Sequence, residues 1–141
     1  MKGNFLIEKV CKRHHRSVID LMQEISNFEP NKEELSRIWD DFNNQGHVHS
    51  VVAIHNDIPI AFGTLVIEKK IRGGTMGHVE DIVTRADFRG KGVGKAIVNE
   101  LSKIAIKEGC YKVSLACKEL NIKFYEKCGY LLNGTSMQLI F

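Results

Sequence analysis

The sequence predicts an α/β (α+β) fold, in which a mixed central sheet of about six to seven strands carries helices on both faces. Short runs rich in β-branched and aromatic residues alternate with segments whose apolar residues recur at helical spacing. Two runs, 49–55 and 60–69, flank the turn sequence Asn-Asp-Ile-Pro and predict a hairpin. A later run leads into a glycine-rich loop and an apolar-striped helix. Elements in this order pack as helices on a mixed sheet.

The first half of the chain predicts one strand and two helices before the hairpin. The strand is expected at 5–10, and the first helix at 17–28. Pro30 and Asn31 end this helix, because proline cannot continue one. A second helix is expected at 32–43, with apolar residues again three and four positions apart.

The second half predicts four more strands and two more helices. The strands are expected at 77–84, 112–116, 130–132 and 136–140. One helix is expected at 92–107, where five apolar residues face inward and Gly109 follows as a stop signal. A short helix is expected at 121–127.

Composition is that of an ordinary soluble protein. We expect a single domain over residues 1–141, because this length supports a substantial core. Hydrophobic residues make up 43% and charged residues 26%. The net charge of +3 suits an anionic cofactor or substrate, but no basic block indicates nucleic-acid binding. No apolar run approaches the ~20 residues that span a bilayer, so no membrane partner is expected.

Cysteine usage indicates a reducing compartment such as the cytoplasm. The four cysteines form no C-x-x-C pair, so neither a zinc site nor another metal site is expected. Charged residues at positions 8, 9 and 12 interrupt the apolar stretch that a signal peptide would need. Reduced thiols in the cytoplasm are therefore expected.

Residues 89–95 predict a phosphate-binding loop at the start of a helix. They read Arg-Gly-Lys-Gly-Val-Gly-Lys and follow a β-branched run. Such a loop offers free backbone N–H groups and the positive end of a helix dipole to a phosphate. A Walker A loop is excluded because three residues, not four, separate Gly90 from Gly94, and Ala96 replaces the hydroxyl. A dinucleotide fingerprint is excluded because Lys95 occupies the third glycine position.

Two segments together resemble the GNAT superfamily of acetyltransferases. The pattern Arg89-x-x-Gly92-x-Gly94 is similar to the coenzyme A pyrophosphate loop of that family. Residues 121–130, Asn-Ile-Lys-Phe-Tyr-Glu-Lys-Cys-Gly-Tyr, resemble the segment that follows the loop in these enzymes. The order of strands and helices also matches. The resemblance implies a GNAT fold with a β-bulge in its fourth strand, a structure that re-aims side chains beside active sites.

The resemblance implies roles for residues on the fourth strand, the loop and the last helix. Acetyl-CoA would be the cosubstrate, with the Ile82 N–H polarising the acetyl carbonyl and the Tyr125 hydroxyl serving the departing thiolate. Val83 and Thr84 would pair with pantetheine, and Asn121 would bind it or order the helix start. The cofactor-binding residues implied are Ile82, Val83, Thr84, Arg89, Gly90, Lys91, Gly92, Val93, Gly94, Lys95, Asn121, Phe124, Tyr125 and Lys127.

Within the family, residues 77–138 resemble the glucosamine-6-phosphate N-acetyltransferase branch. That branch makes N-acetylglucosamine 6-phosphate on the way to UDP-N-acetylglucosamine, and works as a homodimer through its C-terminal strands. The resemblance implies that Glu80 and Asp81 bind the sugar hydroxyls and amine. Proton removal is left to Asp81, Glu80, a backbone carbonyl, water or a histidine, because the acid usual in this branch is missing. Lys70 and Arg72 would lie near the substrate phosphate.

Two departures from the branch keep other acceptors open. The branch has an acid in the pattern L-[DE]-C, where this chain has Ala116. It also places an arginine soon after a terminal Met-Gln, where this chain ends Leu-Ile140-Phe. Losing a charge-assisted contact of this kind costs on the order of 1.5–3 kcal/mol. Another small primary amine or an unphosphorylated amino sugar is therefore the alternative acceptor. A protein N-acetyltransferase and a non-catalytic acyl-CoA-binding module are the remaining alternatives.

Overall fold

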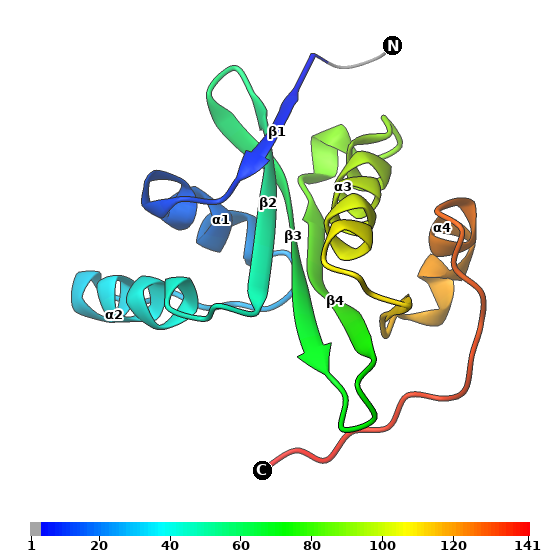
Figure 1. Ribbon diagram of the computed structural model, residues 1–141. Helices are drawn as coiled ribbons and strands as arrows, with labels where there is room; N and C mark the ends of the chain where they lie inside the picture. The colour runs from blue at the N-terminus through cyan, green and yellow to red at the C-terminus, as the bar shows by residue number, and fades with distance from the viewer. Residues whose placement is uncertain (1–3) are drawn as a thin grey trace.

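A five-stranded sheet forms the centre of the computed structural model, which describes residues 4–141 (Figure 1). Its strands run in the order β1-β2-β3-β4-β5, antiparallel from β1 to β4, with β5 parallel to β4. Their bounds are Leu6–Lys9, Val48–His55, Ile58–Lys69, Thr75–Thr84 and Lys112–Ser114. The predicted hairpin at 49–55 and 60–69 is thus confirmed, as is the strand at 77–84.

Helices cover both faces of the sheet, as the sequence predicts. Helix α1, His15–Met22, and helix α2, Lys32–Asn43, lie on one side of the sheet in Figure 1, and α3, Val93–Lys107, lies on the other. Helix α4, Ile122–Lys127, follows a short 3₁₀ turn. The first helix ends earlier than expected, because residues 23–28 leave the helix and the Gln23 side chain bonds the backbone at Phe28.

Two apolar clusters hold the layers together. The α3 face buries Ile97 and Leu101 against strand residues such as Leu65 and Val79. The face toward α1 and α2 buries the side chains Val10, Val18, Leu21, Trp39, Val52, Phe62 and Val83. These positions follow from the sequence, because residues two apart on a strand share a face and residues three or four apart on a helix share a stripe.

A β-bulge in β4 confirms the irregularity expected in the fourth strand. Phe62 pairs with Val83 and Thr64 pairs with Glu80, so Asp81 and Ile82 lie opposite the single residue Gly63. Asp81 has a φ of 54°, in the left-handed region that few non-glycine residues adopt. Gly63 accommodates the bulge, because a Cβ there would lie 2.6 Å from the Ile82 side chain.

Strands β4 and β5 separate beyond a short ladder. They pair only from Met76–Lys112 to His78–Ser114, whereas β4 continues to Thr84. The separation opens the sheet beside the bulge. The end of β4, which pairs with β3 but not with β5, and the chain after β5 therefore line a cleft into which a ligand can enter.

The two C-terminal strands predicted at 130–132 and 136–140 are wrong for the described chain. The sheet has five strands, not six to seven, and Figure 1 shows the red C-terminal segment as an extended trace outside it. The apolar pattern of a strand is present, but β5 is only three residues long and offers this segment no ladder. Its apolar side chains stay exposed, including Leu131, Leu132, Met137, Leu139, Ile140 and Phe141.

Among residues 4–141, no helix is long and apolar enough to span a bilayer.

Candidate active site

Two adjoining cavities lie where β4 and β5 separate. The larger, here the loop cleft, has a volume of about 850 Å³ and is lined by the end of β4, the glycine loop and α4. The smaller, here the β5 pocket, has a volume of about 470 Å³ and is lined by β4, β5, α4 and the C-terminal segment. The residues that line both cavities are Glu80, Leu115, Ala116, Cys117 and Tyr125. A ligand in one cavity can therefore meet a ligand in the other at Tyr125.

The glycine loop has the geometry of an anion site. Gly90 and Gly92 have φ values of 73° and 81°, which turn the backbone into α3. Among the described residues, the backbone N–H groups at 90–95 donate no hydrogen bond, and Ala96 is the first to bond within the helix. A Cβ at Gly94 would lie 3.1 Å from the Thr84 hydroxyl oxygen, so glycine keeps this wall of the cleft open. The donor set fits a pyrophosphate.

Positive side chains surround the loop in different ways. Arg89 and Lys95 line the loop cleft, whereas Lys91 lies over the ring of Phe88 at 5.2 Å. The Arg89 guanidinium pairs with the carboxylate of Glu24 and also donates to the Thr84 carbonyl oxygen. Glu24 comes from the segment after α1, so this pair connects the loop to the opposite layer of the fold.

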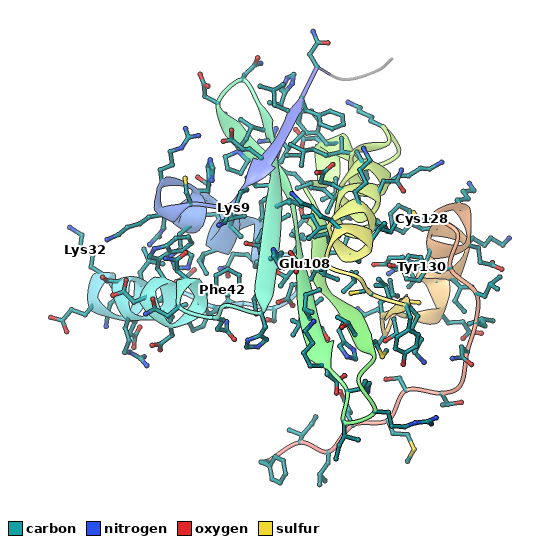
Figure 2. All side chains as sticks on the ribbon, viewed as in Figure 1. Lys9, Lys32, Phe42, Glu108, Cys128 and Tyr130 are labelled. Carbon is teal, nitrogen blue, oxygen red and sulfur yellow. The ribbon has the colours of Figure 1, made fainter. Side chains whose placement is uncertain are left out.

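Tyr125 lies at the junction of the two cavities in a partly apolar environment. Its ring makes edge contacts with Phe124 and Tyr130, at centroid distances of 4.9 and 5.8 Å. Tyr130, labelled in Figure 2, lies between α4 and the sheet. Burial, with a smaller contribution from the nearby Cys117, raises the pKa of Tyr125 to about 12. The hydroxyl is therefore protonated at neutral pH and available as a hydrogen-bond donor.

The bulge presents the two acidic side chains at the same junction. Glu80 lines both cavities and Asp81 lines the loop cleft, and both side chains are exposed. Ile82, the next residue, also lines the loop cleft. Ala116, where the related branch has an acid, adds no charge to this wall.

Most residues singled out from the sequence line the loop cleft. They are Glu80, Asp81, Ile82, Val83, Thr84, Arg89, Gly90, Gly92, Gly94, Lys95, Asn121, Phe124, Tyr125 and Lys127. Lys91 lies outside this lining, and Val93 is buried in the core, 1% exposed. Lys70 and Arg72 lie in the turn between β3 and β4, outside both cavities, so their role toward a phosphate stays a prediction.

Sequence reasoning missed several residues of the site. Glu24, Ile25 and Leu120 line the loop cleft but belong to no motif. Glu24 is 65 positions from its partner Arg89, and only the packing of α1 against β3 and β4 brings the two together. The pairing has no signal in one sequence.

The described residues 4–141 contain no group of three or more histidine, cysteine or acidic side chains arranged to hold a metal ion.

Comparison with known proteins identifies the family to which this fold and cleft belong. The model of the Acetyltransferase (GNAT) family matches residues 16–130, which is most of the chain. The chain belongs to the GNAT acetyltransferase family, as the glycine loop and the segment at 121–130 predicted. Within this family it is similar to proteins named glucosamine 6-phosphate N-acetyltransferase.

Two curated relatives and one solved structure illustrate the similarity. Glucosamine 6-phosphate N-acetyltransferase 1 of Dictyostelium discoideum is 48% identical over 82 residues, which cover 57% of this chain and 52% of that protein. The match thus spans about half the length of that relative. The Candida albicans enzyme is 36% identical over 77% of this chain and 76% of its own. The crystal structure of the Arabidopsis thaliana enzyme superposes with a TM-score of 0.92 at 32% identity, covering 99% of both chains.

Proposed function

We propose that this chain transfers the acetyl group of acetyl-CoA to the amine of glucosamine 6-phosphate, giving N-acetylglucosamine 6-phosphate for UDP-N-acetylglucosamine biosynthesis. The observation that carries the proposal is the continuous lining of the loop cleft, from the glycine loop to the β4 bulge and Tyr125. The relatives named above carry this activity in their names. The four cysteines are free thiols, which suits a reducing compartment such as the cytoplasm.

The loop cleft would hold acetyl-CoA through its own backbone and side chains. The N–H groups at 90–95, Arg89 and Lys95 would bind the pyrophosphate. Val83 and Thr84 would pair with the pantetheine amides, because this end of β4 pairs with β3 on one side and the β5 ladder on its other side stops at His78. Acetyl-CoA, when bound, supplies the acetyl group as a thioester at the junction of the two cavities.

The chain's residues would then assist amine attack. The Ile82 N–H, beside the bulge, would donate to the acetyl oxygen as negative charge develops there; one such donor is worth ~3 kcal/mol. Glu80 and Asp81 would bind the sugar hydroxyls and amine. The Tyr125 hydroxyl would donate a hydrogen bond to the departing sulfur. Holding both substrates in attack geometry can contribute up to ~7–11 kcal/mol.

A homodimer completes this proposal. The C-terminal segment carries six apolar side chains that are at least 74% exposed, namely Leu131, Leu132, Met137, Leu139, Ile140 and Phe141. A second copy of the chain would cover them and supply the strand pairing that the single chain lacks. Sedimentation should therefore give twice the mass of one chain, and a chain ending at Gly134 should sediment as a monomer. A monomeric full chain at micromolar concentration would contradict the dimer.

One further acceptor class is supported by specific residues. Ala116 lies at the cavity junction where the related branch has an acid, and the chain end carries no arginine. Both features weaken recognition of a charged, phosphorylated acceptor. Another small primary amine or unphosphorylated glucosamine is therefore the alternative acceptor for the same chemistry.

Product analysis tests the proposal. The chain is incubated with acetyl-CoA and glucosamine 6-phosphate, and the product is identified by NMR and mass spectrometry. We expect N-acetylglucosamine 6-phosphate, formed in equal amount with free coenzyme A thiol. Thiol release without an N-acetyl product, or no turnover at all, would overturn the proposal.

A further inference from the structure

A histidine on β4 lies beside the proposed acceptor residues and has no assigned role. His78 is two positions before Glu80 on the same strand, so both side chains point to the same face of the sheet. Both line the β5 pocket, together with Ser114 and Tyr125. The histidine thus belongs to the cavity that adjoins Tyr125, where an acceptor amine would meet the thioester.

Glu68 fixes the orientation of this histidine. Its Oε1 lies 2.8 Å from His78 Nε2 and 3.1 Å from Lys70 Nζ. The hydrogen bond with His78 is the largest cause, and the contact with Lys70 the next, of a lowered pKa of Glu68. The side chain is therefore a carboxylate at neutral pH and can only accept hydrogen bonds. Nε2 must therefore carry the ring proton, which leaves the lone pair of a neutral imidazole on Nδ1.

The other ring nitrogen, Nδ1, contacts a residue of the pocket wall. Nδ1 lies 3.5 Å from the hydroxyl oxygen of Ser114, itself part of the β5 pocket lining. The His78 side chain is 34% exposed, so water can exchange protons with it. The other charged or titratable groups around the pocket are Lys70 beyond β3, Glu80 on β4, Lys112 on β5, Cys117 after β5, and Glu126, Tyr125 and Tyr130 from α4 and the segment after it.

We propose that His78, oriented by Glu68, is the proton acceptor for the substrate ammonium, and that this pair replaces the acid absent at position 116. The inference rests on the proposed function, since it assigns a base to that reaction. Imidazole is the side chain that most often accepts a proton in general base catalysis. Ala116, without a side-chain acceptor, leaves this task to another group.

The proton balance is complete without a further reactant. One proton passes from the ammonium to Nδ1, and from there to water. The nitrogen lone pair forms the C–N bond, and the C–S bond breaks as its electron pair leaves on sulfur. The nitrogen loses a second proton, and the departing sulfur takes one up, so the products are an amide, a thiol and one released proton.

The test compares His78→Gln with a matched control, His49→Gln. His49 also faces a carboxylate, that of Glu108 at 3.8 Å, and is 31% exposed, but it lines neither cavity. Glutamine keeps a donor toward Glu68 and cannot accept the proton. We expect kcat/KM for glucosamine 6-phosphate at pH 7 to fall by ~10²–10⁴ in His78→Gln, with KM for acetyl-CoA unchanged. The His49→Gln control should stay within twofold of the wild type.

Two further readouts separate a base from a merely structural pair. The deficit of His78→Gln should shrink as the pH rises, because the free amine no longer needs deprotonation. Added imidazole should restore activity to His78→Ala, and Glu68→Gln should lose about tenfold. Independently of turnover, NMR of the imidazole nitrogens should show the proton on Nε2 in the wild type, and a mixture of tautomers in Glu68→Gln.

Each outcome decides the proposal. A pH-dependent, imidazole-rescued loss supports it. A His78→Gln variant within twofold of the wild type, or a loss that is constant with pH and not rescued, overturns it while leaving the proposed function intact. A wild type that acetylates only a different amine overturns the proposed acceptor, and the same profiles with that amine then decide the role of His78. A wild type with no turnover overturns both.

Discussion

Removing the hydroxyl of Tyr125 is the most informative single change in the cleft. Tyr125→Phe deletes one oxygen and keeps the ring, so the contacts with Phe124 and Tyr130 remain. The variant should therefore fold like the wild type. Any loss of activity then reports the interaction of the hydroxyl with the departing sulfur.

The pKa of Tyr125 sets the size of the expected effect. At about 12, it lies ~3.5 pKa units above that of an ordinary alkyl thiol near 8.5, so complete proton transfer to the thiolate is uphill by ~5 kcal/mol. In the proposed mechanism the hydroxyl would therefore act mainly as a hydrogen-bond donor to a charged acceptor, which is worth ~1.5–3 kcal/mol. This range converts to a fall in kcat/KM of about 10- to 150-fold.

The assay is steady-state release of coenzyme A thiol at pH 7, with thermal unfolding as the check on folding. Tyr111→Phe is the matched control, because Tyr111 is 62% exposed and lines neither cavity. It should keep wild-type activity. A Tyr125→Phe variant within threefold of the wild type would refute the assigned role. A loss above ~10⁴-fold would refute the hydrogen-bond estimate and indicate obligatory proton transfer.

Three further predictions concern packing, cofactor binding and alkaline stability. Gly63→Ala places a methyl group 2.6 Å from the Ile82 side chain and should lower the free energy of unfolding, measured by urea denaturation, by ~1–3 kcal/mol. Gly46→Ala, with open space around it, should change this free energy little, and equal stabilities of the two variants would contradict the packing at the bulge. Arg89→Gln should raise KM for acetyl-CoA about tenfold, and more at low salt, because Arg89 is 61% exposed and its proposed contact with the pyrophosphate would be screened by salt. The equally large charge change Lys103→Gln on α3 should leave this KM unchanged, and an unchanged KM in Arg89→Gln would remove Arg89 from the proposed pyrophosphate site. The folded-state pKa of Tyr125 is raised from 10 to about 12, so its contribution to stability is complete below pH 10 and is lost as the pH rises through 12. The urea midpoint should therefore fall less steeply with pH in Tyr125→Phe than in the wild type over this window, and identical slopes would contradict the burial of Tyr125.

The parts of the fold that sequence predicted are those with local signals. Hydrophobic periodicity located β2, β3, α2 and α3, and the glycine spacing located the glycine loop and, through its resemblance, the family. These signals can be recognised without knowing which distant residues pack together, because an apolar helix stripe or a strand alternation extends over only about ten consecutive positions. The bulge at Asp81 was expected only through the resemblance, since aspartate tolerates a left-handed backbone but does not by itself indicate a bulge.

The parts that sequence reasoning did not find depend on long-range pairing. The apolar pattern at 130–132 and 136–140 is that of strands, but a strand needs a neighbouring edge, and the described chain provides none there. Pairing of Glu24 with Arg89 and of Glu68 with His78 depends on how the layers and strands pack. Periodicity gives the face of each residue but not its partner on another element.

The most direct test of the central claim compares glucosamine 6-phosphate with glucosamine as acceptors, at equal concentrations and saturating acetyl-CoA. Release of coenzyme A thiol gives kcat/KM for each. We predict that glucosamine 6-phosphate leads by more than ~100-fold, a difference of ~2.7 kcal/mol, because the proposed function requires that residues of this chain bind the phosphate. Equal values, or a preference for glucosamine, would contradict the proposed acceptor and leave an N-acetyltransferase of different specificity.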